Sequence, residues 1–283
     1  MTEKKREQLE QLRNWLFVKD TAVIGAVATN LTEASDTLEV AIFLHPLDYH
    51  IVPAEGVWLP EENWFDSAYS SKQGIRLAFR RLDWHTWLNP SFDWPETDKG
   101  LLSNGWLFHD PQDKVAPLIK RKSYYSDQLR FARLDEALVR LDALLMMSGT
   151  ADWEKHGPAI AHDRLQAAYR YLVDGLFALH RRWQVPREKE MQHLLALPWL
   201  PPQFEARILE LQTAVSPSKD AYEERFHTLK LLFQDFTAYL VDSGDYMTMP
   251  VDQALLRTTD EPGRPWNMED WQKHWQIRRL STH

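Results

Sequence analysis

The second half of the chain is dominated by apolar residues that recur every three or four positions. This spacing places the apolar side chains on one face of a helix. The four stripes are Leu134, Leu138, Leu141 and Leu145; Leu165, Tyr169, Leu172, Leu176, Leu179 and Trp183; Phe204, Ile208, Leu211 and Val215; and Tyr222, Phe226, Leu229, Phe233, Phe236 and Leu240. Pro201-Pro202 and Ser216-Pro217 interrupt the pattern. The sequence therefore predicts a bundle of amphipathic helices joined by short loops.

The first part of the chain has a different periodicity. Thr21–Ala28 and Thr37–Leu44 are rich in small and β-branched apolar residues, and a polar stretch at 30–35 separates them, which predicts strand, loop, strand. Over 75–80, apolar and other residues alternate, which predicts a third strand with one apolar face. Residues 3–18 have helical spacing of apolar side chains and predict an opening amphipathic helix.

These patterns predict an α+β protein in three parts. We expect a mixed α/β unit over residues 1–122, in which a small sheet has flanking helices. An all-helical bundle follows over 123–242. The tail, 243–283, contains several prolines and then Trp266, Trp271 and Trp275, and we expect it to pack on the bundle and to end in a short helix.

Composition narrows the classes of function. The 283 residues include no cysteine, which excludes disulfides, thiolate metal sites and thiol catalysis. The formal net charge of -8 argues against a nucleic-acid partner, so we expect a small molecule or a protein instead. No apolar run approaches the length of a signal peptide core or a membrane span, which predicts a cytoplasmic protein that does not bind membranes. Oligomeric state is left open by the sequence.

The stretch Val23–Leu44 carries the most informative motif. Gly25-Ala26 is followed by a polar loop and then by Ser35-Asp36 at the entrance to the second strand. This arrangement resembles the nucleotidyltransferase superfamily of the aminoglycoside- and lincosamide-modifying type, in which a Gly-Ser turn precedes Ser-Asp-x-Asp or Ser-Asp-x-Glu. Three downstream stretches look like uncharacterised bacterial members: GWLFHDP at Gly105–Pro111, LFALHRRWQVPREKE at Leu176–Glu190 and LPWLPPQF at Leu197–Phe204.

The resemblance implies that an active protein would bind Mg²⁺ and a nucleoside triphosphate as cofactors. In this superfamily two carboxylates on one strand face, joined by a third from a neighbouring strand, hold Mg²⁺ on the triphosphate. Asp36 and Glu39 are the candidate catalytic residues and metal ligands. Residues i and i+2 of a strand share a face, but position 38 is Leu38, and Glu39 is one residue too far along. Only a β-bulge or an irregular strand start would bring Asp36 and Glu39 together.

The remaining candidate positions also depart from the family pattern. The third carboxylate falls on Ala78, flanked by Arg76 and Arg80, which would repel a metal cation and attract a phosphate, or simply form a solvated strand face. Gly25 and Ala26 keep the small size of the turn but lose its hydroxyl.

Three more polar residues are candidates for contacts with phosphate. Ser35 and Thr29 are substitute hydroxyl donors, or ordinary polar loop residues. Lys189 follows the basic end of the longest predicted helix, His180-Arg181-Arg182, where cations either cap the helix or face substrate phosphates.

These residues are compatible with two functions of different classes, and a third function has less support from the sequence. The first is a nucleotidyltransferase-like pseudo-enzyme with a depleted metal site, which binds a nucleotide or a partner. The alternative is an active enzyme that transfers an NMP group from a nucleoside triphosphate to a hydroxyl of a small molecule or protein. The third is an interaction protein that uses Trp266, Trp271 and Trp275 as anchors. Zinc-hydrolase, serine-hydrolase, P-loop and Rossmann motifs are absent from the sequence.

Overall fold

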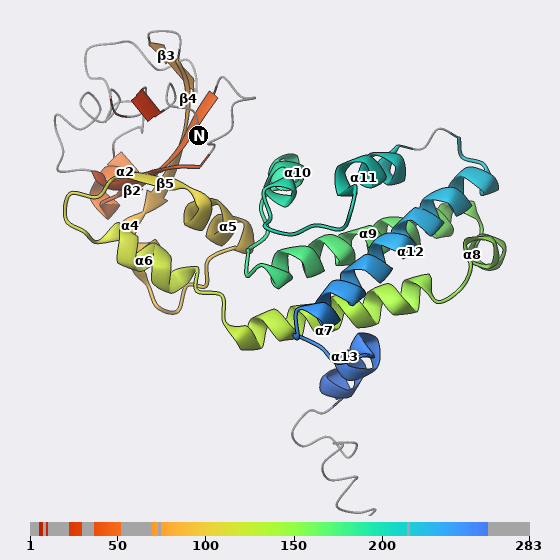
Figure 1. The fold of residues 1–283 in the computed structure, drawn as a ribbon. Helices are drawn as coiled ribbons and strands as arrows, with labels where there is room; N and C mark the ends of the chain where they lie inside the picture. Colours follow the sequence, from red (N-terminus) through yellow and green to blue (C-terminus); the bar gives the residue numbers. More distant parts are fainter. Residues whose placement is uncertain are drawn as a thin grey trace, which may run out of the picture. The chain divides into compact units, whose positions relative to one another are not determined.

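The computed structural model describes residues 23–29, 37–51, 69–72, 75–213 and 216–259, together with Arg6, Glu7 and Glu10. It is an α+β protein made of two compact units (Figure 1). The first unit comprises Met1–Tyr124 and the short stretch Trp183–Pro186, and the second comprises the rest of the chain. The division after Tyr124 lies next to the predicted limit at residue 122.

The first unit contains a five-stranded mixed sheet with the order β3-β4-β2-β1-β5. The strands are β1 (Val23–Ala28), β2 (Thr37–Leu44), β3 (Tyr69–Lys72), β4 (Ile75–Asp83) and β5 (Trp106–His109). Strands β2 and β4 are parallel, whereas the other neighbours are antiparallel. The strands predicted from apolar and alternating residues, β1, β2 and β4, are confirmed. Strands β3 and β5 have four residues each, too few to show a period.

Helices cover one face of this sheet. Four helices of the first unit are described: α2 (Pro46–Ile51), α4 (Trp84–Leu88), α5 (Glu96–Asn104) and α6 (Val115–Lys122). Trp87 of α4, Leu102 of α5 and Val115 of α6 join strand residues such as Phe43 in one buried cluster. Asp110 accepts hydrogen bonds from the backbone amides of residues 114–116 and so caps α6.

The stretch Trp183–Pro186 packs within the first unit although it follows a long helix of the second. The Trp183 indole Nε1–H donates to the carbonyl oxygen of Ser123 at 2.7 Å, and the Lys99 ammonium lies 4.4 Å from the centroid of the Trp183 ring. A Cβ atom on Gly100 would lie 2.2 Å from the backbone oxygen of Gln184, so only glycine permits this approach. Trp183 is therefore not part of the helix predicted to include it, which ends at Leu179.

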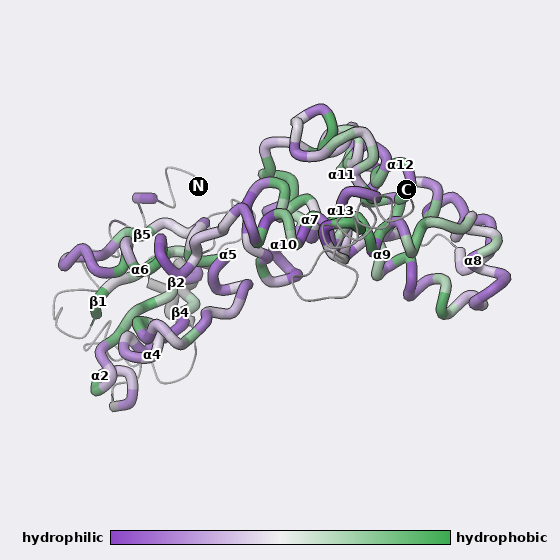
Figure 2. Tube along the Cα trace, turned by 90° about the horizontal axis from the view of Figure 1, so that it is seen from below, coloured by the Kyte–Doolittle hydropathy of each residue, from purple (hydrophilic) through white to green (hydrophobic). Residues whose placement is uncertain are grey.

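The second unit is entirely helical in its described residues. Its helices are α7 (Asp127–Leu145), α8 (Gly149–His156), α9 (Pro158–Leu179), α10 (Arg187–Leu195), α11 (Phe204–Gln212), α12 (Lys219–Asp242) and α13 (Pro250–Thr259). The predicted stripes correspond to α7, α9, α11 and α12, along which hydropathy alternates between green and purple in Figure 2. Helix α7 packs against α9 and α13, while α12 contacts α8, α9 and α11. Ser126, Ser148 and Ser218 cap three helices through their side chains.

Buried ion pairs attach α13 and the turn before it to α7. The buried carboxylate of Asp135 accepts hydrogen bonds from the Tyr246 hydroxyl at 2.7 Å and from Arg257 at 2.7 and 2.9 Å. Arg130 donates to both oxygens of Asp245, at 2.8 and 2.5 Å. Residues 243–259 are thus packed within the helical unit.

Two predictions for the ends of the chain stay predictions. The C-terminal segment with Trp266, Trp271 and Trp275 lies outside the described residues, as does most of the opening helix predicted over 3–18. Among the helices that are described, none combines the length and the apolar character needed to cross a bilayer.

The Arg130–Asp245 pair predicts a pH-dependent contribution to stability. Hydrogen bonds from Arg130 lower the pKa of Asp245, so the pair stabilises the fold above the carboxyl's unfolded pKa of about 3.9, and this contribution is lost as pH falls through the lower folded value. We expect Asp245→Asn to reduce the free energy of unfolding by about 1–2 kcal/mol at neutral pH and by much less at pH about 3. Urea denaturation at both pH values measures the difference.

The control is Asp242→Asn, which removes an exposed carboxylate from the last residue of α12, three positions before Asp245. It should change the free energy of unfolding by no more than about 0.5 kcal/mol at either pH. An equal loss for Asp245→Asn at both pH values would contradict the electrostatic role of Asp245.

Candidate functional site

The parallel register of β2 and β4 defines the candidate site. Thr37 pairs with Arg76, Glu39 with Ala78 and Ala41 with Arg80. Directly paired residues project to the same side of a sheet, and so do residues two apart. Glu39 and Ala78 are therefore neighbours on the face where Ala41 and Phe43 enter the buried cluster under the helices. Both are half-buried.

This register puts a methyl group where the resemblance implies a metal ligand. The third carboxylate of the superfamily comes from the strand beside the one that carries the first two, and the structure indeed has β4 beside β2. The residue of β4 next to Glu39 is Ala78, which has no ligating atom. Of the two paired positions, only Glu39 therefore carries a carboxylate.

Arg80 is engaged by a carboxylate within its own unit. It forms a bidentate pair with Asp98 of α5, with Nη2 2.8 Å from Oδ2 and Nη1 hydrogen-bonded to Oδ1. The Asp98 side chain is 4% exposed and that of Arg80 is 52% exposed. The Arg80 guanidinium also lies 5.7 Å from the centroid of the Trp87 ring. Because a buried carboxylate needs a cation, the first role of Arg80 is to compensate Asp98 rather than to bind a phosphate.

Gly25 and Ala26 lie inside a strand, which differs from the turn expected of them. Both belong to β1, paired with Phe43 and Ile42 of β2, and Ala26 is fully buried. A Cβ atom on Gly25 would lie 2.5 Å from Cγ2 of Val115 and 3.0 Å from the His109 carbonyl oxygen. The glycine thus permits close packing of α6 against the sheet, in a part of β1 where the register shifts between Val23 and Gly25 and between Ala26 and Val27.

The other sequence-predicted residues are dispersed or not described. Asp36 and Ser35 lie outside the described residues, so the convergence of Asp36 with Glu39 stays a prediction. For Arg76 only the backbone position on β4 is described. The Thr29 hydroxyl and amide both donate to the carbonyl oxygen of Glu39.

Lys189 lies on α10 and belongs to the helical unit, not to the unit of the sheet. Burial lowers the pKa of His193, and the positive charges of Lys189 and Arg182 lower it further. Sequence reasoning missed Asp98, because its pairing with Arg80 depends on how α5 folds back onto the sheet.

The residues in place do not match a complete magnesium site. Across 23–29, 37–51, 69–72, 75–213 and 216–259, no three His, Asp or Glu side chains are arranged to hold a metal ion. Magnesium requires oxygen ligands in near-octahedral geometry. At the paired positions of β2 and β4, Glu39 supplies such an oxygen and Ala78 supplies none.

Comparisons with known proteins show only distant similarity, and it is to solved structures. The sequence matches no family model and no curated protein. Among solved structures, the chain is similar to a nucleotidyltransferase-like protein from Exiguobacterium sibiricum. The two are 12% identical, the alignment covers 97% of this chain and 87% of that chain, and the TM-score is 0.40. Similarity at this level assigns neither a reaction nor a ligand.

The packing role of Gly25 predicts a coupled pair of substitutions. Gly25→Ala should lower the free energy of unfolding by about 1–3 kcal/mol, because the new methyl group overlaps Val115. In a Val115→Ala background the same change should cost about 1 kcal/mol less, since the nearest overlapping atom is gone. Denaturant unfolding of the four proteins of this cycle measures the coupling. Strictly additive losses would show that Val115 is not what requires a glycine at this position.

Proposed function

We propose that the chain is a nucleotidyltransferase-like protein with a depleted metal site, which binds a nucleotide or a partner with little or no catalysis. The observation that carries this proposal is the pairing of Glu39 with Ala78 across β2 and β4. The sequence motif at Ser35-Asp36 and the parallel placement of the two strands support the relation to the superfamily. The methyl group of Ala78 supports the loss of activity.

The physical reason is the charge of the reaction. Transfer of a nucleotidyl group requires a metal ion that neutralises the triphosphate and stabilises the attacking and leaving oxygens. Removing one carboxylate of three lowers the negative charge that attracts Mg²⁺ and leaves a coordination position unfilled. Position 38, the regular partner of Asp36 on its strand face, is also a leucine.

Calorimetry with nucleotides separates the inactive protein from an active enzyme. ATP and GTP are titrated into the full chain with and without Mg²⁺, and we expect binding that is absent or equal under the two conditions. Glu39→Gln should leave the result unchanged, because no magnesium depends on that carboxylate. Magnesium-dependent binding that Glu39→Gln abolishes, with release of pyrophosphate, would establish an active nucleotidyltransferase and overturn the proposal.

A gain-of-function variant tests the geometry directly. Ala78→Asp places a second carboxylate beside Glu39, and two such oxygens attract a divalent cation far more strongly than one. We expect Ala78→Asp to bind Mn²⁺ at least about tenfold more tightly than the unchanged chain, as measured by electron paramagnetic resonance. The control is Ala78→Asn, which has the same shape without the charge. Equal Mn²⁺ affinity for the two variants, both folded by circular dichroism, would show that position 78 and Glu39 do not form a site.

A further inference from the structure

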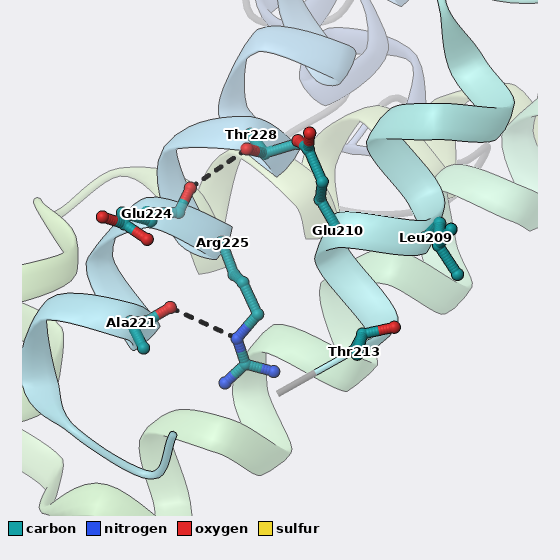
Figure 3. A pocket seen from close by; sticks show the side chains of 7 residues that line it. All are labelled: Leu209, Glu210, Thr213, Ala221, Glu224, Arg225 and Thr228. Carbon is teal, nitrogen blue, oxygen red and sulfur yellow. Dashed lines mark hydrogen bonds between the residues drawn. The ribbon is translucent and has the colours of Figure 1, made fainter. Parts of the chain in front are cut away.

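A groove in the helical unit contains a buried cation that no carboxylate of the described chain neutralises. It lies between α11 and α12 and has a volume of about 490 Å³ (Figure 3). Leu209, Glu210 and Thr213 line it from the side of α11, and Glu224, Arg225 and Thr228 line it from α12. The groove belongs wholly to the helical unit, so a ligand bound there is independent of the proposed function at the sheet.

Arg225 is the unusual residue of this groove. It is 7% exposed, and its Nε–H donates to the carbonyl oxygen of Ala221 at 3.3 Å. Its Nη2–H donates to Nδ1 of His162 at 2.7 Å. Burial, and then the charge of Arg225, lower the pKa of His162, so the imidazole is neutral and accepts this bond. The remaining N–H groups of the guanidinium have no partner within the described ranges.

The other arginines packed in this unit show what Arg225 lacks. Arg130 pairs with Asp245, and Arg257 pairs with Asp135. Arg164 pairs with the buried Asp152, which also accepts a hydrogen bond from the hydroxyl of Tyr222. A guanidinium stays charged at neutral pH, and a buried charge without a counter-ion costs several kcal/mol. The unmatched charge of Arg225 therefore favours an anionic group brought by a ligand.

A simple anion does not suit the rest of the groove. Glu210 and Glu224 are exposed carboxylates on its lining, and neither forms an ion pair within the described residues. They would repel a second negative charge and attract a positive one. Figure 3 shows the Arg225 guanidinium extending beside Ala221, away from the Glu210 carboxylate, which lies near Thr228. Leu209, whose side chain is 67% exposed, provides apolar surface in the same lining.

We infer that the α11–α12 groove binds a small zwitterion whose carboxylate pairs with Arg225 and whose ammonium group lies against Glu210, because Figure 3 shows the Glu224 carboxylate on the other side of α12. Because the two charges of the groove are separated, the ligand carries its carboxylate and its amine at opposite ends of a short aliphatic chain, as in an ω-amino acid. The carboxylate is held by charge-assisted hydrogen bonds in a desolvated position, and these are the stronger contacts. The ammonium contacts are exposed and weaken with salt.

Three probes of matched chain length test the charge pattern. The full chain is titrated with δ-aminovalerate, a zwitterion, with glutarate, a dianion, and with cadaverine, a dication, while amide shifts of Thr213 and Thr228 are followed by NMR. We expect δ-aminovalerate to bind at least about tenfold more tightly than either of the others. If glutarate binds as tightly as δ-aminovalerate, the groove is an anion site, and if cadaverine does so, it is a cation site. If none of the probes binds, the groove is not a binding site. Each of these results overturns the inference.

Variants identify the residues responsible. Arg225→Gln and Glu210→Gln should each weaken δ-aminovalerate binding by about tenfold. Glu205→Gln is the matched control, since it removes the same charge from an exposed position of α11 outside the groove, and it should leave the affinity unchanged. Arg225 also donates a hydrogen bond to His162, whereas Glu210 is exposed, so Glu210→Gln tests the inference without altering buried contacts. An unchanged affinity in Glu210→Gln would overturn the zwitterion assignment.

Discussion

The register between β2 and β4 is the constraint on which the interpretation of the sheet depends. Side chains alternate across the pleat, so a slip of one residue would exchange the two faces of a strand. The buried cluster prevents such a slip, because Ala41, Phe43 and Leu82 must all project toward α4, α5 and α6. With these residues in place, Glu39 and Ala78 must lie side by side. The same packing that stabilises the sheet thus determines which residue stands beside the candidate ligand.

The partners of the arginines indicate which of them stabilise the fold and which is left to bind a ligand. Arg80, Arg130, Arg164 and Arg257 each meet a carboxylate that is largely buried, namely Asp98, Asp245, Asp152 and Asp135. Each pair offsets the desolvation of both partners, and removal of either one leaves an uncompensated charge. An arginine committed in this way contributes little to a phosphate or carboxylate from outside. Arg225 differs, because its hydrogen-bond acceptors among the described residues, a carbonyl oxygen and a neutral imidazole, carry no negative charge.

Periodic stretches could be predicted from sequence, whereas features that depend on distant contacts could not. Strands β1, β2 and β4 and helices α7, α9, α11 and α12 follow from hydrophobic period, because that period reflects burial along a single element. Gly25-Ala26 lies inside the strand that hydrophobic period predicts and not in the turn that the family motif implies, and a glycine that permits a turn looks the same in sequence as one that admits Val115. Trp183 fits the helical spacing of α9, yet its contacts with Lys99 and Ser123 place it in the sheet unit. Asp98 has no local signal that points to Arg80.

The charges around Glu39 form the physical basis of the proposal that the metal site is depleted. Several carboxylates gathered on one face repel each other, so a site with three of them destabilises the protein until a cation binds. Ala78 removes one of these charges, and Arg80 brings a cation that is itself neutralised by Asp98. At Gly25, the close approach of Val115 leaves no room for a larger side chain in β1. Charge at positions 39, 78 and 80 and packing at Gly25 are therefore accounted for by contacts within the sheet unit, and these contacts are the physical support for the proposal of a depleted metal site.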